Sequence, residues 1–356
     1  LPRAGNIGGG GFILIYNEKK GKVFSIDYRS AAPKSSTSDL FLNGDKVVRF
    51  GHLVNAVPGS VAGLLKAHDD HGTLPISELL QPAIRLAREG FEVSYDLNFV
   101  LDWGRESMVV NEASKRKFYE SDEEPIKVKS NFKQPNLAKT LQKISEQGKD
   151  VFYQGEIAKW ISDESLSNGG LITLEDMASY RAKDRDVIET FYRGYRIVSM
   201  PPSASGGLVL LQTLNILENF NLKSFGHNSA KTIHLLSEAM QRAYADRAEY
   251  HGDPDFYEVP VKALLSKKYS LKLSKEISEN RTPDGQIFEG DLKKYDESPD
   301  TTHFSIIDAE GNAVSNTYTL GSSFGSGVTI KKGGFLMNNQ MRNFSHFYGQ
   351  EDAEYG

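Results

Sequence analysis

The sequence contains no cysteine among its 356 residues. That absence excludes disulfide bonds, thiolate zinc sites and a cysteine nucleophile. A basic surplus is also missing, because the formal net charge is −5, and this argues against nucleic acid or an anionic membrane surface as a partner. The longest apolar runs, at residues 12–16 and 208–211, are far too short to cross a bilayer. The composition that remains, 39% apolar and 25% charged, is typical of a globular chain with a sizeable core.

Both ends of the sequence resemble cut ends. Leu1 is not an initiator Met, and no charged-then-apolar leader precedes the first predicted strand. The polar residues 350–355 before Gly356 close no predicted element. We therefore expect a fragment or a mature form that is truncated at both ends.

Hydrophobic periodicity predicts an α+β fold. Residues 12–16 and 22–28 are predicted to form a first hairpin, and residues 302–307 and 313–320 a second, around the turn at 308–311. Ser77 is predicted to cap a helix that ends near Gly90, and Thr173 with Asp176 forms a capping signal. A strand is expected at 196–200. Further helices are expected at residues 58–72, 94–108, 136–148, 156–166, 208–220 and 230–250.

Glycines at positions 8–11 could suggest a phosphate-binding loop. Such a loop needs a strand before the glycines and a helix after them, so that a helix N-terminus faces the phosphate. Here the strand follows the glycines and no Gly-Lys-Ser/Thr is present. Tight backbone packing at the start of a strand is the better interpretation.

Residues 321–325 match the G-x-S-x-G pattern of a nucleophile elbow around Ser323. The elbow requires a helix directly after the serine, followed by an acid and a histidine. No helical pattern follows, and no Asp or Glu lies between Ser323 and His346. A glycine-rich loop is therefore expected.

His251, Asp253 and Asp255 lie close enough in sequence to suggest a metal site. Around Gly252 and Pro254, such residues more often form a turn with local side-chain hydrogen bonds. We therefore predict no metal ligand in this segment.

Thr301 begins the second predicted hairpin, directly after the polar, charged segment 274–299. A cut between Asp300 and Thr301 would give Thr301 a free α-amine as well as its hydroxyl. An α-amine titrates near pH ~7.7–8, so part of it is neutral and can accept the hydroxyl proton. One residue would then supply nucleophile and base, although a Thr-Thr pair in an edge strand is common by itself.

Motifs along nearly the whole chain resemble those of the γ-glutamyltranspeptidase family of N-terminal-nucleophile hydrolases. Their order and spacing make the resemblance specific. They are residues 5–12 (GNIGGGGF), 27–29 (DYR), 56–60 (AVPGS), 169–173 (GGLIT), 200–207 (MPPSASGG), 244–247 (YADR), 252–256 (GDPDF) and 312–320 (NAVSNTYTL).

The resemblance implies a four-layer α-β-β-α sandwich that is made as a precursor and cuts itself between Asp300 and Thr301. Residues 1–300 would be the large-subunit part and residues 301–356 the start of the small subunit, within one structural domain. The implied reaction is hydrolysis or transfer of a γ-glutamyl amide such as glutathione, with no metal or cofactor. Related enzymes are often exported, which implies a periplasmic or extracellular location.

The resemblance also assigns roles to individual residues. Thr301 would be the nucleophile, and Thr319 would hydrogen-bond to it and support its reactivity. Arg29 would grip the substrate α-carboxylate with its guanidinium fork. Gln340 and Asn343 would lie near the substrate α-amine.

This sequence departs from the family pattern at two positions. Asn343 replaces the carboxylate that pairs with the substrate ammonium, and Gly321 replaces an asparagine of the same pocket. A hydrogen bond to a charged group is worth roughly 1.5–3 kcal/mol, so recognition of the ammonium should weaken. The family's paired serines and glycine pair, which form the oxyanion and carboxylate contacts, are expected beyond Gly356.

Three hypotheses follow. The first is a γ-glutamyl amide hydrolase or transferase whose partners are the small-molecule amide, water or an amine acceptor, and the two subunits of one precursor. The second, favoured by Asn343 and Gly321, is a related acylase for glutaryl or cephalosporin-type amides. The third is a degenerate member that binds small acidic ligands without turnover, against which the presence of Thr301, Thr319 and Arg29 argues.

Overall fold

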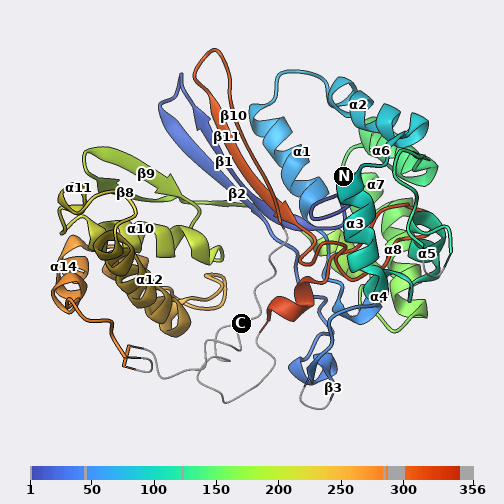
Figure 1. Ribbon diagram of the computed structural model, residues 1–356. Helices are drawn as coiled ribbons and strands as arrows, with labels where there is room; N and C mark the ends of the chain where they lie inside the picture. Colours follow the sequence, from blue (N-terminus) through green and yellow to red (C-terminus); the bar gives the residue numbers. More distant parts are fainter. Residues whose placement is uncertain (1, 44–45, 122–123, 284–285, 288–300, 345–356) are drawn as a thin grey trace.

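The computed structural model describes residues 2–43, 46–121, 124–283, 286–287 and 301–344. Its centre is an antiparallel five-stranded sheet of order β10-β11-β1-β2-β7 (Figure 1). The strands are β1 (Gly10–Asn17), β2 (Lys22–Tyr28), β7 (Lys183–Arg185), β10 (Thr302–Ile307) and β11 (Ala313–Thr319). Strands from the two ends of the described chain therefore lie side by side in one sheet.

The two faces of this sheet differ in burial. Because side chains alternate along a strand, Ile13, Ile15, Ile26 and Tyr28 share one face, where they form a buried cluster with residues of α1 (Ser60–His71). The opposite face of β1 carries half-buried side chains at alternate positions. The sheet therefore has one face covered by a helix and one that is less covered.

A first group of helices adjoins α1. It includes α2 (Ile76–Glu89), α6 (Pro135–Gln147), α7 (Asp150–Tyr153), α8 (Glu156–Ser167) and α9 (Leu174–Ser179). Nearby are α3 (Tyr95–Trp103), α4 (Arg105–Met108) and α5 (Glu112–Phe118). The largest buried cluster joins α1, α7 and α8 to the loop at residues 328–337.

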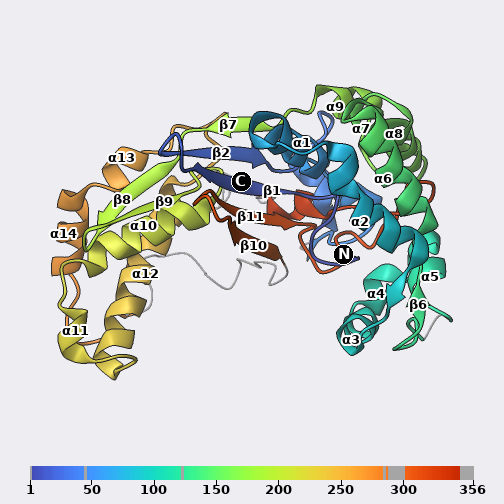
Figure 2. The ribbon, with the colours of Figure 1, turned by 90° about the horizontal axis from the view of Figure 1, so that it is seen from above.

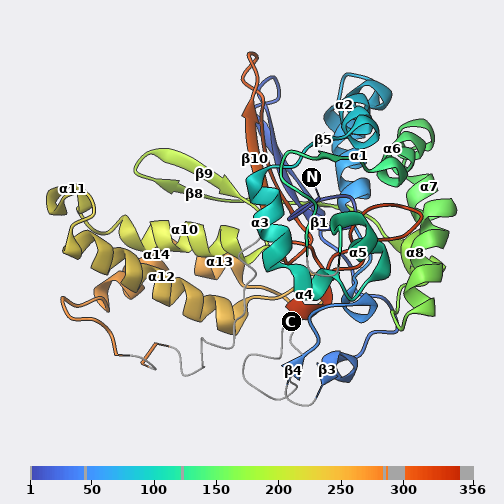
Figure 3. The ribbon, with the colours of Figure 1, turned by 45° about the vertical axis from the view of Figure 1, so that its right-hand side comes forward.

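A second group of elements, which we call the second lobe, lies at the other side of the sheet (Figures 2 and 3). It consists of the hairpin β8 (Ile188–Tyr192) and β9 (Tyr195–Ser199) with helices α10 (Ser205–Leu217), α11 (Leu222–Phe225), α12 (Ala230–Tyr250), α13 (Val261–Leu264) and α14 (Lys267–Lys275). Two apolar clusters of its own hold it together, one around Ile216 and Leu235 and one around Leu211 and Leu264. Strand β7 leads from the sheet into this lobe.

Short elements complete the described chain. They are the strand pairs β3 (Leu42–Asn43) with β4 (Lys46–Val47) and β5 (Phe91–Glu92) with β6 (Asn131–Phe132), and the 3-10 helices η1 (Ser38–Phe41), η2 (His52–Val54) and η4 (Gln340–Asn343). Among the described residues, no helix has both the length and the apolar character needed to cross a membrane.

The expected hairpins are confirmed, and α12 has the expected bounds. The helix expected at 94–108 is two helices, α3 and α4, which Gly104 separates, and the helix expected at 208–220 is α10, three residues earlier. The capping signal at Thr173 is a capping box with Asp176. The cap predicted at Ser77 is wrong: α2 begins at Ile76 after Pro75, whose extended backbone and carbonyl group already start the helical hydrogen bonds. Strands β7 and β8 were not predicted, since β7 has only three residues, all of them charged, and β8 has only five.

Candidate active site

Thr301 immediately precedes β10 and is exposed. In the sheet, Thr302 pairs with Tyr318, and Gly10 pairs with Thr319. When the register of β10 and β11 is continued by one residue, Thr301 lies opposite Thr319. The predicted nucleophile and its predicted supporting hydroxyl are therefore neighbours across two strands.

Arg29 continues the same row. The pairing of β1 with β2 has Gly11 opposite Tyr28, so Arg29, the next residue, follows opposite Gly10. Thr301, Thr319, Gly10 and Arg29 thus form one row across β10, β11, β1 and β2. With strands about 4.8 Å apart, the row is about 14 Å long.

The row faces away from α1. Tyr28 and Tyr318 belong to the cluster under α1, so their neighbours Arg29 and Thr319 point to the other face of the sheet. The guanidinium of Arg29 lies 5.8 Å from the ring centroid of Phe12, which alternation puts on that same face. Thr301, Thr319 and Arg29 consequently lie on one face of the sheet, in one row across its strands.

Gln340 links this row to the chain around it. It is buried, and its side-chain Nε2 donates to the carbonyl oxygen of Thr319 at 3.4 Å. Its Oε1 accepts a short hydrogen bond from the hydroxyl of Ser30, next to Arg29. The hydroxyl of Thr319 accepts a hydrogen bond from the backbone N–H of Gly321 at 2.9 Å.

Asn343 and Gly321 occupy different settings. Asn343 is exposed at the end of η4, three residues after Gln340. Gly321 has a left-handed backbone (φ 96°), and a Cβ there would lie 2.2 Å from Oδ1 of Asn339. Arg342, which precedes Asn343, donates from Nη1 to the hydroxyl of Ser322, the residue after Gly321, at 3.0 Å. Asp300, the other half of the predicted cleavage point, lies outside the described residues.

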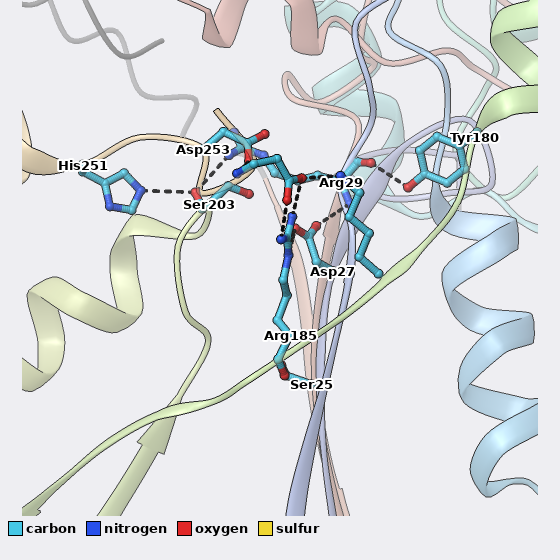
Figure 4. Close-up of polar contacts among 10 residues, drawn as sticks. Ser25, Asp27, Arg29, Tyr180, Arg185, Ser203, His251 and Asp253 are labelled. Atoms are coloured by element: carbon cyan, nitrogen blue, oxygen red, sulfur yellow. Dashed lines mark hydrogen bonds and ion pairs between the residues drawn. The ribbon is translucent and has the colours of Figure 1, made fainter. Parts of the chain in front are cut away.

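Arg29 is surrounded by charged and polar groups from distant segments (Figure 4). Its Nη1 donates to the carbonyl oxygen of Ser203 at 3.0 Å. Its backbone N–H donates to Oδ1 of Asp27 at 3.0 Å, and its carbonyl accepts from the hydroxyl of Tyr180 at 2.7 Å. Burial lowers the pKa of Arg29, whereas the nearby carboxylates of Asp27 and Asp253 raise it.

These observations agree with the comparison to known proteins. The model of the gamma-glutamyltranspeptidase family matches residues 1–355. The chain belongs to this family. It is 46% identical to the glutathione hydrolase proenzyme of Escherichia coli (strain K12), over 97% of this chain and 60% of that protein. It therefore spans about three-fifths of that relative's length.

Two solved structures extend the comparison. A gamma-glutamyltranspeptidase of Helicobacter pylori is similar with a TM-score of 0.77 and 40% identity, over 79% of this chain and 82% of that one. A cephalosporin acylase of Bacillus halodurans is similar with a TM-score of 0.85 and 28% identity, over 99% of this chain and 64% of that one. The fold is thus shared by gamma-glutamyltranspeptidases and by an acylase.

The glycines at positions 8–11 of this gamma-glutamyltranspeptidase-family chain have a packing role, as predicted. A Cβ at Gly9 would lie 2.1 Å from the carbonyl oxygen of Thr319, and one at Gly11 would lie 2.2 Å from that of Thr317. Only bare backbone fits between β1 and its neighbours there.

The other two patterns also have the expected local structures. Ser323 is buried in a series of turns with no helix after it, which confirms the loop. Residues 254–256 form a turn, in which the backbone N–H of Asp255 donates to the carboxylate of Asp253 at 3.0 Å. Across the part of the chain that the structure describes, no group of three or more His, Cys, Asp or Glu is arranged to hold a metal ion.

Sequence reasoning missed the residues that surround Arg29. The alternation of β2 could have indicated Asp27, which shares a strand face with Arg29. Ser203, Tyr180 and Arg185 lie more than 150 residues further along the chain, and no local pattern connects them with Arg29. Only the folded sheet and the second lobe bring them together.

Proposed function

We propose that this chain forms the larger part of a γ-glutamyl amide hydrolase or transferase that acts through an N-terminal threonine. Thr301 is the nucleophile, and glutathione-like amides are the substrates. One observation carries the proposal: the sheet register aligns Thr301, Thr319 and Arg29 in one row on one face. A nucleophile, a supporting hydroxyl and an anion-binding guanidinium at one level suit a substrate with a scissile amide at one end and a carboxylate at the other.

Self-cleavage creates the nucleophile in this proposal. The hydroxyl of Thr301 attacks the carbonyl carbon of Asp300, and the amide nitrogen of Thr301 becomes the leaving group and takes up a proton. Water then hydrolyses the resulting ester, which releases the Asp300 carboxylate and restores the hydroxyl. Thr301 is left with a free α-amine that titrates near pH ~8.

Turnover uses the same hydroxyl. The α-amine takes its proton while the oxygen attacks the γ-carbonyl of the substrate, and the departing amine takes that proton up. The acyl group is then transferred from the Thr301 ester to water or to an acceptor amine. Because Thr319 already accepts a hydrogen bond from Gly321 at 2.9 Å, its own hydroxyl hydrogen can point toward Thr301.

Arg29 binds the substrate α-carboxylate in this scheme. A guanidinium offers two parallel N–H groups that match the two carboxylate oxygens. Gln340, which contacts both Ser30 and Thr319, lies between the two ends of the row and is proposed to bound the pocket near the substrate amine. Asn343 is proposed to lie at the entrance of that pocket.

The proposed complete fold is a four-layer α-β-β-α sandwich, with residues 1–300 as the large-subunit part and 301–356 as the start of the small subunit. The half-buried face of the central sheet supports this arrangement. Phe12, Leu14 and Tyr16 are only partly covered there, as expected for a surface on which a second sheet packs.

The test is gel analysis and an assay of the full-length protein. Wild type should give two bands and should hydrolyse L-γ-glutamyl p-nitroanilide, whereas Thr301→Ala should give one band and no hydrolysis. Thr301→Ser should keep both activities at a lower rate, because it keeps the hydroxyl and the amine. A single uncut band from wild type with full amide hydrolysis would overturn the proposal.

A second candidate is an acylase for glutaryl or cephalosporin-type amides. It is favoured by Asn343, which carries no charge to pair with a substrate ammonium, and by the similarity to a cephalosporin acylase. The two are separated by side-by-side assays with γ-glutamyl and glutaryl anilides. Asn343→Asp should raise γ-glutamyl turnover if Asn343 contacts the amine, and an unchanged rate would remove Asn343 from the pocket.

A further inference from the structure

The guanidinium of Arg29 donates a hydrogen bond to a neutral carbonyl group. Nη1 donates to the carbonyl oxygen of Ser203 at 3.0 Å, and the ring of Phe12 lies 5.8 Å away. The backbone of Arg29 is fixed as well, by Asp27 on its N–H and Tyr180 on its carbonyl. A carbonyl orients the guanidinium without neutralising it, while the nearby carboxylates of Asp27 and Asp253 add negative charge around it. The N–H groups of the guanidinium that do not bind Ser203 can still donate to an anionic ligand.

The same carbonyl also contacts His251. Nε2 of His251 lies 3.3 Å from the carbonyl oxygen of Ser203 (Figure 4). Nδ1 of the ring is buried and has no hydrogen-bond partner in the described chain, and burial lowers the pKa of His251. These contacts assign a neutral ring with its proton on Nε2, which donates to the Ser203 carbonyl. The carbonyl thus accepts from Arg29 on one side and from His251 on the other.

The loop that begins at His251 is anchored to the sheet by Asp255. The Asp255 carboxylate accepts from Nη1 and Nη2 of Arg185 at 2.7 and 2.8 Å, and from Lys183. Arg185 holds the pKa of Asp255 well below its usual range, so this carboxylate stays ionised at neutral pH. Nε of Arg185 also donates to Oδ2 of Asp27 at 3.3 Å.

These contacts form a closed circuit. It runs from Arg29 to the Ser203 carbonyl, then to His251, along the loop to Asp255, through Arg185 to Asp27, and back to the backbone of Arg29. Its members come from β2, β7, the loop before α10 and the loop after α12. The orientation of Arg29 therefore depends on groups of the second lobe.

We propose that His251 and Asp255 are positioning residues that hold the guanidinium of Arg29 for a substrate carboxylate. The inference rests on the proposed function and names two residues through which the second lobe sets substrate affinity. His251 acts by orienting the Ser203 carbonyl, and Asp255 acts by fixing the loop that carries His251. Their loss lets the guanidinium rotate away, which weakens substrate binding and leaves the chemistry at Thr301 intact.

The test uses full-length Asp255→Asn, His251→Phe and His251→Gln with two substrates. L-γ-glutamyl p-nitroanilide has the α-carboxylate, and 4-aminobutanoyl p-nitroanilide keeps the amine and chain but lacks it. Asp255→Asn and His251→Phe should raise KM for the first substrate about tenfold, part of what a hydrogen bond to a charged group contributes, with little change in kcat. Their kcat/KM for the second substrate should not change. His251→Gln, which keeps a donor, should restore most of the affinity.

Glu189→Gln is the matched control. Glu189 pairs with Arg196 at 2.6 Å on the exposed β8–β9 hairpin, so this substitution removes the same charge from an arginine pair outside the circuit. It should leave both substrates unaffected.

The outcomes separate the inference from the function on which it rests. A wild type that does not hydrolyse the γ-glutamyl anilide overturns both. A wild type that does, with variants that keep its KM or lose kcat for both substrates alike, overturns the positioning role and leaves the proposed function standing. If Asp255→Asn does not fold, the comparison of His251→Phe with His251→Gln decides.

Discussion

The hydroxyl and the carbonyl group of Thr319 make hydrogen bonds with different partners. The carbonyl accepts from Gln340 and the hydroxyl accepts from the backbone N–H of Gly321. The hydroxyl can accept this hydrogen bond and still donate its hydrogen toward Thr301. The loss of this hydroxyl would therefore affect both the local structure and the proposed nucleophile, Thr301.

Thr319→Val should slow both self-cleavage and γ-glutamyl hydrolysis, because Thr301 loses a polar neighbour and the Gly321 N–H loses its acceptor. A polar group with a role in the transition state contributes about 10²-fold in rate. Thr319→Ser keeps the hydroxyl and should retain most of both activities. Gel densitometry and anilide kinetics measure the two effects, and equal rates for Val and wild type would remove Thr319 from the mechanism.

Lys117, in the last turn of α5, gives a pH-dependent prediction. Burial lowers the pKa of its ammonium to about 8, and Nζ donates to the carbonyl of Gly334 at 2.9 Å. The pKa of Lys117 in the folded protein lies below its value in the unfolded chain, which is about 10.4. Below pH ~8 the folded state therefore bears the full cost of burying the charge. As the pH rises from ~8 to ~10.4 that cost is relieved, and the free energy of unfolding increases.

The free energy of unfolding of Lys117→Met should therefore be measured against that of wild type at pH 7 and pH 10. From pH 7 to pH 10, the free energy of unfolding of wild type should increase relative to that of the variant by about 1–3 kcal/mol. Urea denaturation at each pH measures it. A difference that stays constant with pH would mean that Lys117 titrates normally.

At the scale of elements, α1 can approach the sheet because it carries Gly63. A Cβ there would lie 2.1 Å from Cγ of Tyr28, whose ring is fully buried. Gly206 is also helical, in α10, but it is exposed and a Cβ there would meet nothing within 4 Å. The two glycines have opposite expected responses to the same substitution.

Gly63→Ala should destabilise the protein by about 1–3 kcal/mol, because overpacking outweighs the better helix propensity of alanine. Gly206→Ala should be neutral or stabilising by up to about 1 kcal/mol. Thermal unfolding of both variants checks this. A stabilising Gly63→Ala would show that α1 can shift away from the sheet without cost.

Much of the element order was predictable because both hairpins and α12 have strong periodic patterns. The start of α2 was not, since the pattern favoured a cap at Ser77, whereas the backbone of Pro75 begins the helix. At the site, the resemblance to family motifs predicted roles for Thr301, Thr319 and Arg29. Their alignment in one row depends on strand register, which no single segment contains.

At the scale of the whole molecule, β1 joins the two proposed subunits. It pairs with β2 of the large-subunit part and with β11 of the small subunit, from Gly10–Thr319 to Tyr16–Ala313. A cut before Thr301 would leave this shared sheet intact. The second lobe, in contrast, was not predicted as a separate group of elements. Its links to the sheet are short β7 and contacts between distant residues, such as Arg185–Asp255 and Arg29–Ser203, which no local pattern contains.

The cleaved full-length protein should therefore elute as one species in gel filtration and separate only under denaturing conditions. Wild type and uncut Thr301→Ala should elute at the same volume, which serves as the control. Dissociation of the two pieces on simple dilution in native buffer would contradict a shared sheet.

The bare backbone at the start of β1 sets a limit on how this sequence can vary. At residues 8–11 an added methyl group would meet backbone atoms of neighbouring segments at 2.0 to 2.5 Å. A saturation library selected for folded protein should consequently return glycine alone at these four codons. The helical Gly206, where an added methyl group meets nothing within 4 Å, should accept alanine and other residues. The contrast between these positions would show, from the accepted residues alone, how closely the start of β1 packs against its neighbouring segments.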